Sequence, residues 1–220
     1  EERVFGSENG IFVAYADIPD DLKDALVAIE DHRFFEHQGV DWVTTVKACA
    51  RMFFGDDSAG GSSITQQLIK NVLLSEDDSA DEVTVQRKVQ EIFRALAVEE
   101  LYTKDEILEW YLNTIYLGEG CYGVQSAAKV YFAKDLDELT VKECACLIGI
   151  TNNPSMYDPY IAPQSNHKRT LIILNEMRKR GYIKTEAEYE AAKEQELVFR
   201  NGLYDNEEYQ CSSCGFIGER

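Results

Sequence analysis

Apolar residues recur at a helical period along most of the chain. Leu22, Leu26 and Ile29 form one stripe, because side chains three or four residues apart lie on one face of a helix. Three further stripes with this spacing predict three more amphipathic helices. They comprise Ile64, Leu68 and Val72; then Val85, Val89, Ile92 and Leu96; and then Leu108, Tyr111, Leu112 and Ile115. The pattern therefore predicts a mainly α fold.

Local signals mark where several helices begin and end. Gly181 predicts the end of one helix, directly after the basic residues 178–180. Residues 3–15 instead resemble short strands around a turn, because Asn9 and Gly10 lie between apolar runs. A threonine followed three residues later by glutamate is typical of a capping box, in which each side chain bonds the other residue's backbone N–H. Such pairs are Thr103 with Glu106, Thr140 with Glu143, and Thr185 with Glu188.

The chain is strongly acidic, with 40 Asp and Glu residues against 22 Lys and Arg residues and a net charge of −18. Nucleic acid is therefore not an expected partner, because its phosphates require a basic face, and any anionic ligand needs a local basic cluster. No apolar run is long enough to span a membrane, and residues 1–10 lack the regions of a signal peptide. We expect that any membrane anchor is not present in this chain.

The cysteines are scattered, apart from Cys211 and Cys214 in the C-terminal CSSC. A zinc or redox role for this pair stays open beside incidental thiols or a tail disulfide, because no second ligand pair accompanies it. No repeat or proline-rich linker divides the chain, and the acidic segment 75–82 predicts an exposed loop. We expect one domain over residues 1–195 and a tail or truncated linker over residues 196–220.

The first candidate for chemistry is AIEDHRFFEHQGVDW, residues 28–42. Glu30 follows apolar residues at the end of a predicted helix, which suits a general base, and Asp31, His37 and Asp41 are candidates to orient it. The alternative is a capped helix end with solvated acids and structural histidines, which is the commoner role of such residues. The histidines lack HExxH spacing, and no serine or cysteine completes a triad.

The second candidate is GGSSITQQLIKN, residues 60–71, in which a glycine-rich entry leads into a helix with amides and a lysine. Backbone N–H groups at a helix start attract anions, so this segment could present several donors to a sugar or a phosphate. The alternative is a capped helix with a solvated polar face. The spacing of a phosphate-binding P-loop is absent. The donors are Ser62, Gln66, Gln67 and Lys70.

The third candidate is RKVQEIFRAL, residues 87–96. Arg87 and Lys88 lie four and three residues before Glu91, so the three side chains are neighbours on one flank of a helix. Two cations beside one carboxylate can bind a diphosphate. An ordinary surface ion-pair ladder explains the segment equally well when it is considered alone.

Taken in this order, the three segments resemble the peptidoglycan glycosyltransferases of family 51, the polymerising domain of class A penicillin-binding proteins and of monofunctional transglycosylases. EDHRFFEHQGVD resembles the motif EDxxFxxHxGxD, GGSSITQQLIKN resembles GxSTITQQxxKN, and RKVQE resembles RKxxE. Residues 104–113 resemble KxxILxxYLN, and residues 120–135 resemble the glycine and YFxK segment that follows it. The late segment LTVKECACLIGITNNPSMYDP also agrees with the family.

The resemblance implies a lysozyme-like head lobe and a smaller, membrane-proximal jaw lobe near residues 42–55. When that apolar stretch is considered alone, burial in the core is the better interpretation of it. The implied location is the outer face of the bacterial cytoplasmic membrane. The implied partners are the membrane surface and a transpeptidase domain or other cell-wall synthesis proteins. The chain itself has no SxxK, SxN and KTG set, so we expect no transpeptidase within it.

The resemblance also implies a substrate, lipid II, joined to a growing glycan chain by inverting transfer with release of undecaprenyl diphosphate. Glu30 would be the general base and Glu91 the second catalytic carboxylate. Lys70, Arg87 and Lys88 would hold the diphosphate, and Glu91 would position them or a divalent cation, Mg²⁺ or Mn²⁺. The sugars or phosphates of the donor would contact Ser62, Gln66 and Gln67.

Two departures from the family pattern stand out. Val83 replaces an arginine that often lies four residues before the RK pair, and the STIT of the second motif is SSIT here. Two rival functions stay open. A lysozyme-like glycoside hydrolase also needs two carboxylates in a helical fold, and a non-catalytic scaffold would bind wall precursors without joining them.

Overall fold

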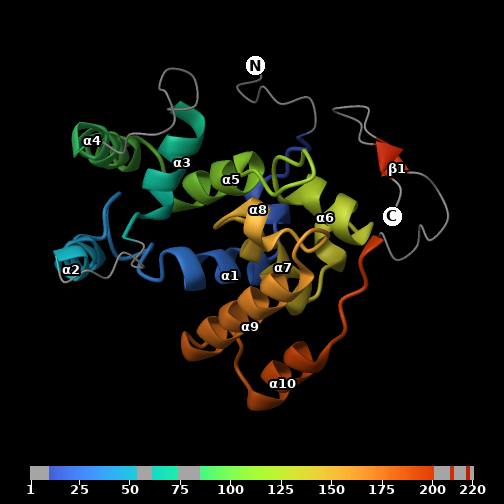
Figure 1. Cartoon of the computed structure of the whole chain (residues 1–220). Helices are drawn as coiled ribbons and strands as arrows, with labels where there is room; N and C mark the ends of the chain where they lie inside the picture. The colour runs from blue at the N-terminus through green and yellow to red at the C-terminus, as the bar shows by residue number, and fades with distance from the viewer. Residues whose placement is uncertain (1–9, 54–60, 74–84, 201–208, 211–216, 219–220) are drawn as a thin grey trace.

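The computed structural model describes residues 10–53, 61–73, 85–200, 209–210 and 217–218. The predicted mainly α fold is confirmed, because helices form most of this part of the chain (Figure 1). The one pair of strands among these residues is β1 (Tyr209–Gln210) with β2 (Ile217–Gly218), which is antiparallel. The long helices are α1 (Asp20–Glu30), α2 (Trp42–Phe53), α3 (Ile64–Leu73), α4 (Val85–Leu101), α5 (Lys104–Thr114), α6 (Val124–Phe132), α7 (Val141–Ile150), α9 (Pro163–Lys179) and α10 (Glu186–Glu194); the short ones are η1 (Tyr15–Asp17), η2 (Leu136–Glu138) and α8 (Pro154–Tyr157).

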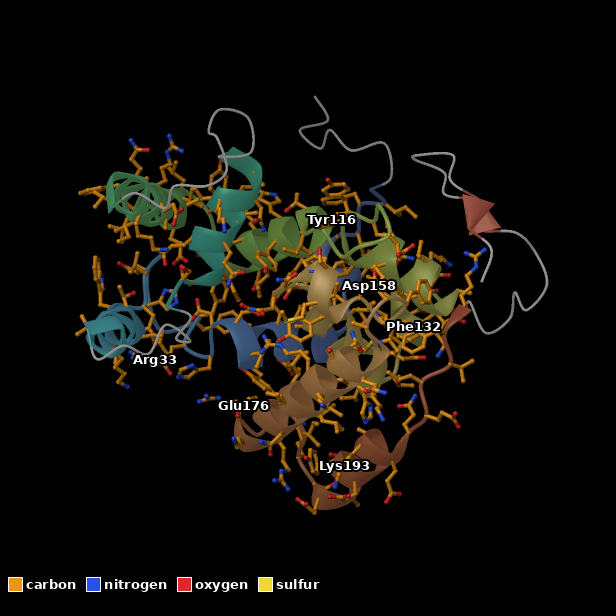
Figure 2. All side chains as sticks on the ribbon, viewed as in Figure 1. Arg33, Tyr116, Phe132, Asp158, Glu176 and Lys193 are labelled. Atoms are coloured by element: carbon orange, nitrogen blue, oxygen red, sulfur yellow. The ribbon has the colours of Figure 1, made fainter. Side chains whose placement is uncertain are left out.

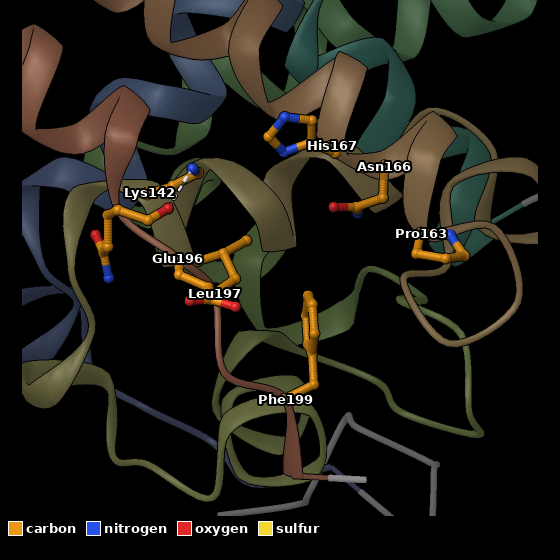
Figure 3. Close-up of a pocket in the computed structure, with 8 residues that line it drawn as sticks. Lys142, Pro163, Asn166, His167, Glu196, Leu197 and Phe199 are labelled. Atoms are coloured by element: carbon orange, nitrogen blue, oxygen red, sulfur yellow. Dashed lines mark hydrogen bonds between the residues drawn. The ribbon is translucent and has the colours of Figure 1, made fainter. Parts of the chain in front are cut away.

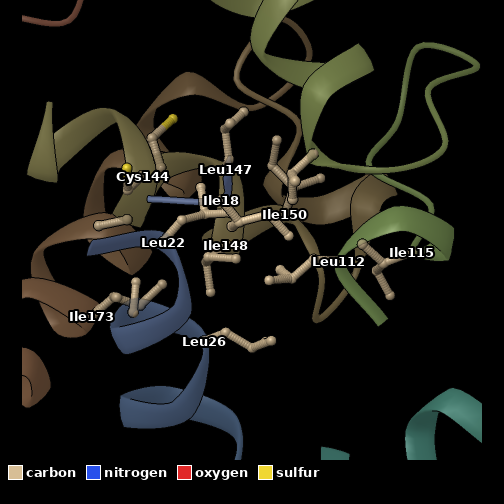
Figure 4. Packing of buried hydrophobic residues seen from close by; sticks show 14 of the residues in the cluster. Ile18, Leu22, Leu26, Leu112, Ile115, Cys144, Leu147, Ile148, Ile150 and Ile173 are labelled. Atoms are coloured by element: carbon tan, nitrogen blue, oxygen red, sulfur yellow. The ribbon is translucent and has the colours of Figure 1, made fainter. Parts of the chain in front are cut away.

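The core is built around α7. This helix is apolar on nearly every side, which is typical of a helix enclosed by others, and its residues from Lys142 to Ile150 are all buried. It packs on α1 and α9 (Figure 4). Leu22 and Leu26 of the first predicted stripe are fully buried in this core. The core therefore fixes α1, and with it Glu30 at the last position of that helix.

The predicted capping boxes and the predicted helix end are confirmed. The side chains of Thr103, Thr140 and Thr185 each accept a hydrogen bond from the backbone of the glutamate three residues later, and each glutamate bonds back. Gly181 follows α9 with φ +80°, the left-handed conformation that glycine adopts at no steric cost.

The predicted strands near the N-terminus are wrong for the described residues 10–15. Residues 11–14 belong to no helix or strand, Gly10 forms only an isolated bridge with Tyr122, and η1 begins at Tyr15. Backbone groups of Ile11 and Val13 pair with side chains instead of with a neighbouring strand. Val13 N donates to Asn113 Oδ1 at 2.8 Å, and Asn113 Nδ2 donates back to Val13 O at 2.8 Å. Ile11 N donates to Ser126 Oγ at 3.1 Å. Polar side chains of α5 and α6 thus satisfy the backbone groups that a hairpin would have paired.

Helices α2, α3 and α4 lie toward one end of the molecule (Figure 1), and α3 packs against α4. A small apolar cluster of Val40, Ile69 and Ala95 joins α3 to α4. Two residues of the predicted stripes are exceptions, because Val72 and Val89 are 42% and 43% exposed. They extend the helical period without contributing to the core.

Gly39 marks a close approach between two segments. Its φ is +80°, and a Cβ atom added to it would lie 2.6 Å from the carbonyl oxygen of Ala95 in α4. Its own carbonyl accepts a hydrogen bond of 2.5 Å from Ser63 Oγ, just before α3. The turn after Glu30 is therefore pressed against both α3 and α4 at a point where no side chain fits.

The first turn of α2 is exposed, which contradicts the interpretation of this stretch as core. Trp42, Val43 and Val46 are 54%, 44% and 64% exposed. The side chains of residues 48–60 lie outside the described part. No helix among the described residues is long and apolar enough to cross a membrane.

The segment after α10 packs on the same core as the helices. Phe199 stacks on Phe132 with ring centroids 5.3 Å apart. Figure 2 labels Phe132, which is the last residue of α6. The ammonium of Lys142 in α7 is buried and donates to the carbonyl of Lys193 at 2.8 Å and to that of Gln195. The described contacts of this segment reach Arg200, five residues past the boundary expected from the sequence, whereas Cys211 and Cys214 lie outside the described residues.

Candidate active site

Glu30 lies at the end of α1 with two side-chain partners from distant parts of the chain. Its side chain is only 11% exposed. Gln67 Nε2 of α3 donates to Glu30 Oε2 at 2.9 Å, and Arg169 Nη2 of α9 lies 3.4 Å from Glu30 Oε1. Each carboxylate oxygen therefore has one donor. The candidate base is held in a defined orientation, unlike an acid at a solvated helix end.

Gln67 is itself oriented by Tyr111 of α5, whose hydroxyl donates to Gln67 Oε1 at 2.9 Å. Tyr111 is fully buried, and burial together with the charge of Glu30 raises the pKa of its phenol well above the usual value. The phenol therefore keeps its proton and acts as a donor. Because its oxygen accepts from Tyr111, the amide of Gln67 must point its NH₂ group at Glu30. The sequence predicted Gln67 as a substrate contact, and the structure gives it this second role.

Arg169 was not predicted from the sequence. Its guanidinium lies over the ring of Tyr157, 5.8 Å from the centroid, and its stem crosses α7 at Gly149. A methyl group at Gly149 would lie 3.3 Å from Arg169 Cγ, which is tighter than an ordinary contact. Arg169 Nε is buried and has no hydrogen-bond partner among the described residues. The arginine thus has a donor left beside Glu30.

The second carboxylate, Glu91 of α4, is 5% exposed and forms a separate cluster with a lysine and a serine. Lys88 Nζ donates to Glu91 Oε2 at 3.0 Å and to Ser62 Oγ at 2.8 Å. The predicted neighbours Lys88 and Glu91 therefore do meet, and Ser62 from the glycine-rich entry joins them. Lys70 is exposed on α3, whereas the side chain of Arg87 lies outside the described residues.

Asp31 and His37 support the segment that follows Glu30. His37 Nε2 donates to Asp31 Oδ2 at 2.9 Å, and the backbone N–H of Ile64, at the start of α3, donates to the same oxygen at 3.1 Å. Both side chains are nearly buried, at 6% and 4% exposed for His37 and Asp31. The pair ties the end of α1 to the beginning of α3, which carries Gln67.

Asp41 and Gln66 are helix caps in the structure. Asp41 Oδ1 accepts a hydrogen bond from the backbone N–H of Val43 at 3.0 Å and so caps the start of α2. Burial raises the pKa of Asp41, but the side-chain and backbone donors at this cap outweigh burial and hold the pKa below its usual value. Gln66 is 1% exposed, and its Oε1 accepts from Ser63 N at 2.9 Å, while Gln66 N donates to Ser63 Oγ at 3.2 Å. A capping box thus occupies Gln66 Oε1, whereas Gln66 Nε2 is buried and has no hydrogen-bond partner among the described residues. The predicted contact between Gln66 and a substrate stays a prediction.

A cavity of about 210 Å³ lies elsewhere, between α7, the first turns of α9 and the segment after α10 (Figure 3). None of the predicted site residues lines it. Among the described residues, no group of three or more His, Cys, Asp or Glu side chains is placed to hold a metal ion. The cavity is lined by Lys142, Pro163, Asn166, His167, Gln195, Glu196, Leu197 and Phe199.

The described part of the chain thus holds one oriented carboxylate, Glu30, and a second carboxylate, Glu91, that is paired with a lysine. A family model described as Transglycosylase matches residues 2–178. The chain therefore belongs to the transglycosylase family, and its resemblance to the peptidoglycan glycosyltransferases of family 51 is confirmed.

Individual relatives agree with this assignment. Penicillin-binding protein 1A of Streptococcus pneumoniae is 42% identical over 187 residues, which cover 85% of this chain and 26% of that protein. A Cupriavidus necator protein that carries the name transglycosylase is 41% identical over 181 residues, which cover 82% of this chain and 76% of that protein. The crystal structure of penicillin-binding protein 1A from Haemophilus influenzae matches with a TM-score of 0.50 and 26% identity, over 86% of this chain and 18% of that one. The chain thus spans about a quarter of the penicillin-binding protein from S. pneumoniae that it matches.

Proposed function

We propose that this domain polymerises lipid II into glycan strands during bacterial cell-wall synthesis, by inverting transfer with release of undecaprenyl diphosphate. The family supplies the class of reaction. The observation that carries the proposal for this chain is the carboxylate of Glu30, which is nearly enclosed and held by Gln67 at 2.9 Å and Arg169 at 3.4 Å. A base that must meet one hydroxyl of a bound sugar needs such a fixed direction.

In this proposal Glu30 is the general base. It takes the proton from the 4-hydroxyl of the acceptor's N-acetylglucosamine while that oxygen attacks the anomeric carbon of the donor's N-acetylmuramic acid. The bond from that carbon to the diphosphate breaks, its electron pair leaves with the diphosphate, and the configuration changes from α to β. Gln67 and Arg169 keep the carboxylate directed at the acceptor throughout, and the free Nε–H of Arg169 is a further donor beside it.

The leaving diphosphate needs cations more than it needs a strong acid. We assign this task to Lys88, with Lys70 and Arg87, while Glu91 fixes Lys88 through their 3.0 Å contact. Ser62 shares the ammonium of Lys88 and offers a hydroxyl to the donor substrate. In an acidic chain, such a local cluster is what makes binding of an anionic lipid possible.

The described residues do not form a resident metal site around Glu91. Its Oε2 is already paired with Lys88, and no cluster of further ligands surrounds it in the described part. A dependence on Mg²⁺ or Mn²⁺ stays a prediction, to be tested by polymerisation before and after treatment with EDTA and after adding each ion back.

The proposed location is the outer face of the cytoplasmic membrane, with the membrane surface as a partner. Support comes from the exposed apolar side chains at one end of the molecule, Trp42 and Val46 of α2 and Phe93 of α4, the last 67% exposed. This end corresponds to the proposed jaw lobe, and the helices around α7 correspond to the head lobe. A transpeptidase domain is a further proposed partner, because the chain matches only part of penicillin-binding protein 1A relatives.

One assay separates the proposed function from its rivals. The protein is incubated with lipid II, and separately with finished peptidoglycan, and the products are separated by gel electrophoresis and chromatography. Polymer from lipid II with intact peptidoglycan is the expected result. Soluble fragments from peptidoglycan without polymer would establish a lysozyme-like hydrolase instead, and binding of lipid II without any product would establish a scaffold.

A further inference from the structure

A buried charged pair lies beneath the first turn of α3, outside the groups assigned to the reaction. Lys104, the first residue of α5, and Glu99 near the end of α4 approach to 2.5 Å, with side chains only 21% and 3% exposed. Burying two charges costs free energy that their attraction often only just offsets, and apolar pairs of similar size are frequently as stable. Stability alone therefore does not account for an ion pair at this position.

Each partner of the pair reaches a different side of the proposed active site. Glu99 Oε1 accepts a hydrogen bond of 2.5 Å from Thr65 Oγ1, and Thr65 is fully buried in the first turn of α3, two residues before Gln67. The ammonium of Lys104 lies 4.2 Å from the ring centroid of Phe34, which is fully buried in the turn after Glu30. The pair thus links the helix that carries Gln67 to the turn that follows Glu30.

The charges around the pair support this connection. Burial lowers the pKa of Lys104, whereas Glu99 and Asp31 act in the opposite direction. Asp31 is the residue that bonds the backbone N–H of Ile64 at 3.1 Å. Lys104 therefore experiences the negative charge of Asp31, at the end of α1, as well as that of Glu99 in α4.

We propose that Lys104 and Glu99 are positioning residues for glycosyl transfer, because together with Thr65 and Phe34 they hold α3 in register against the end of α1 and so set the contact between Gln67 and Glu30. The inference rests on the proposed function. It assigns these two residues no contact with substrate. They act on the reaction only by fixing the orientation of the Glu30 carboxylate.

The test is a charge-free double variant, Lys104→Met with Glu99→Gln, which leaves no unpaired buried charge and keeps an acceptor for Thr65. The melting temperature of this variant is expected to stay close to that of the wild type. Its kcat for lipid II polymerisation should fall about tenfold while KM changes little, because a small misplacement of reacting groups lowers the rate rather than the affinity. Lys129→Met is the matched control, since it removes an ion pair with Asp135 whose side chains are 41% and 57% exposed.

A spectroscopic measurement gives a readout apart from activity. In nitrogen-15 NMR spectra, the side-chain amide of Gln67 is expected to shift in the double variant, in the same direction as in Glu30→Gln, and to stay in place in Lys129→Met. Thr65→Val is a second variant, which cuts the link to α3 and keeps the ion pair, and it should move the same resonance and lower kcat. An unmoved Gln67 resonance with wild-type kcat in these variants overturns the inference. Absence of polymer with the wild type would instead reject the proposed function, and the NMR comparison would still test the link.

Discussion

The two carboxylates of the site are held in different ways. Glu30 has one donor on each oxygen, from residues 37 and 139 positions away in the chain, and one of these donors is itself fixed by Tyr111. Glu91 has a lysine of its own helix as partner, three residues before it. The Lys88 side chain is 35% exposed, and Lys70 is exposed on the neighbouring helix.

This difference matches the two tasks that we propose. A base must present a lone pair in one direction, so tertiary contacts of the core hold Glu30. A cationic site for a diphosphate that enters and leaves with a lipid must open to solvent or to membrane, so flexible lysine side chains suit it. The predictions below test this contrast, from the largest expected effect to the smallest.

Replacing Glu30 by Gln should give the largest loss. The variant keeps the size of the side chain and removes the proton acceptor, so kcat for lipid II polymerisation should fall by about 10²- to 10⁴-fold. Binding of lipid II, measured by fluorescence with a labelled substrate, should change little. Wild-type kcat in this variant would reject Glu30 as the base, and an equal loss in binding would contradict the separation between the two regions.

Arg169→Met should lower kcat by about 10- to 100-fold, because Glu30 loses the donor on one oxygen and the site loses the free Nε–H. Steady-state kinetics with lipid II measure this change. Arg178→Met, on the same helix, removes an ion pair with Glu186 whose side chains are 37% and 65% exposed, and it serves as the control. Equal rates for the two variants would mean that Arg169 has no part in the reaction.

Lys88→Met tests the cationic region and should act mainly on KM. Loss of one charged contact to a diphosphate should raise KM about tenfold, with a smaller change in kcat. The dependence of kcat/KM on salt concentration should also become weaker, because fewer charges attract the anionic substrate. A fall in kcat at unchanged KM and salt dependence would place Lys88 with the base rather than with the diphosphate.

Gly149→Ala should give the smallest effect. It should leave the protein as stable as the wild type or more stable, and it should lower kcat. Alanine favours the helix over glycine by up to about 1 kcal/mol, so the melting temperature should rise or stay level. The added methyl group would lie 3.3 Å from Arg169 Cγ and displace that side chain, which should lower kcat by about threefold. A variant that is both more stable and fully active would show that the path of the Arg169 stem does not matter.

Local signals in the sequence predicted much of the fold. Capping boxes depend on residues three apart, so Thr103, Thr140 and Thr185 marked helix starts correctly. The strands expected in the N-terminal segment failed for a non-local reason, because Asn113, a hundred residues away, satisfies the backbone of Val13. Periodicity likewise could not show that Val72 and Val89 lie beyond the reach of the core.

Only those parts of the site that lie within sequence motifs could be predicted. Lys88 and Glu91 are neighbours on one helix, so their contact follows from spacing alone. Gln66 and Gln67 are adjacent and chemically identical. The spacing of Ser63 and Gln66 matches a capping box, but nothing local tells that Gln67 meets Glu30. Arg169 reaches Glu30 across 139 positions, and its only sign in the sequence is an arginine among other polar residues.

Gly39 has a consequence for genetics. Its turn leaves no space for a side chain beside Ala95, and its carbonyl holds Ser63 at the entry to α3. In a library of random substitutions, this position should therefore tolerate nothing, as would be expected of a residue that reacts. A map of tolerance alone would place Gly39 beside Glu30 among the essential residues, although it has no functional group. The two would separate once protein abundance is scored next to cell growth, since Gly39 variants should be lost from the cell and Glu30 variants should accumulate as inactive protein.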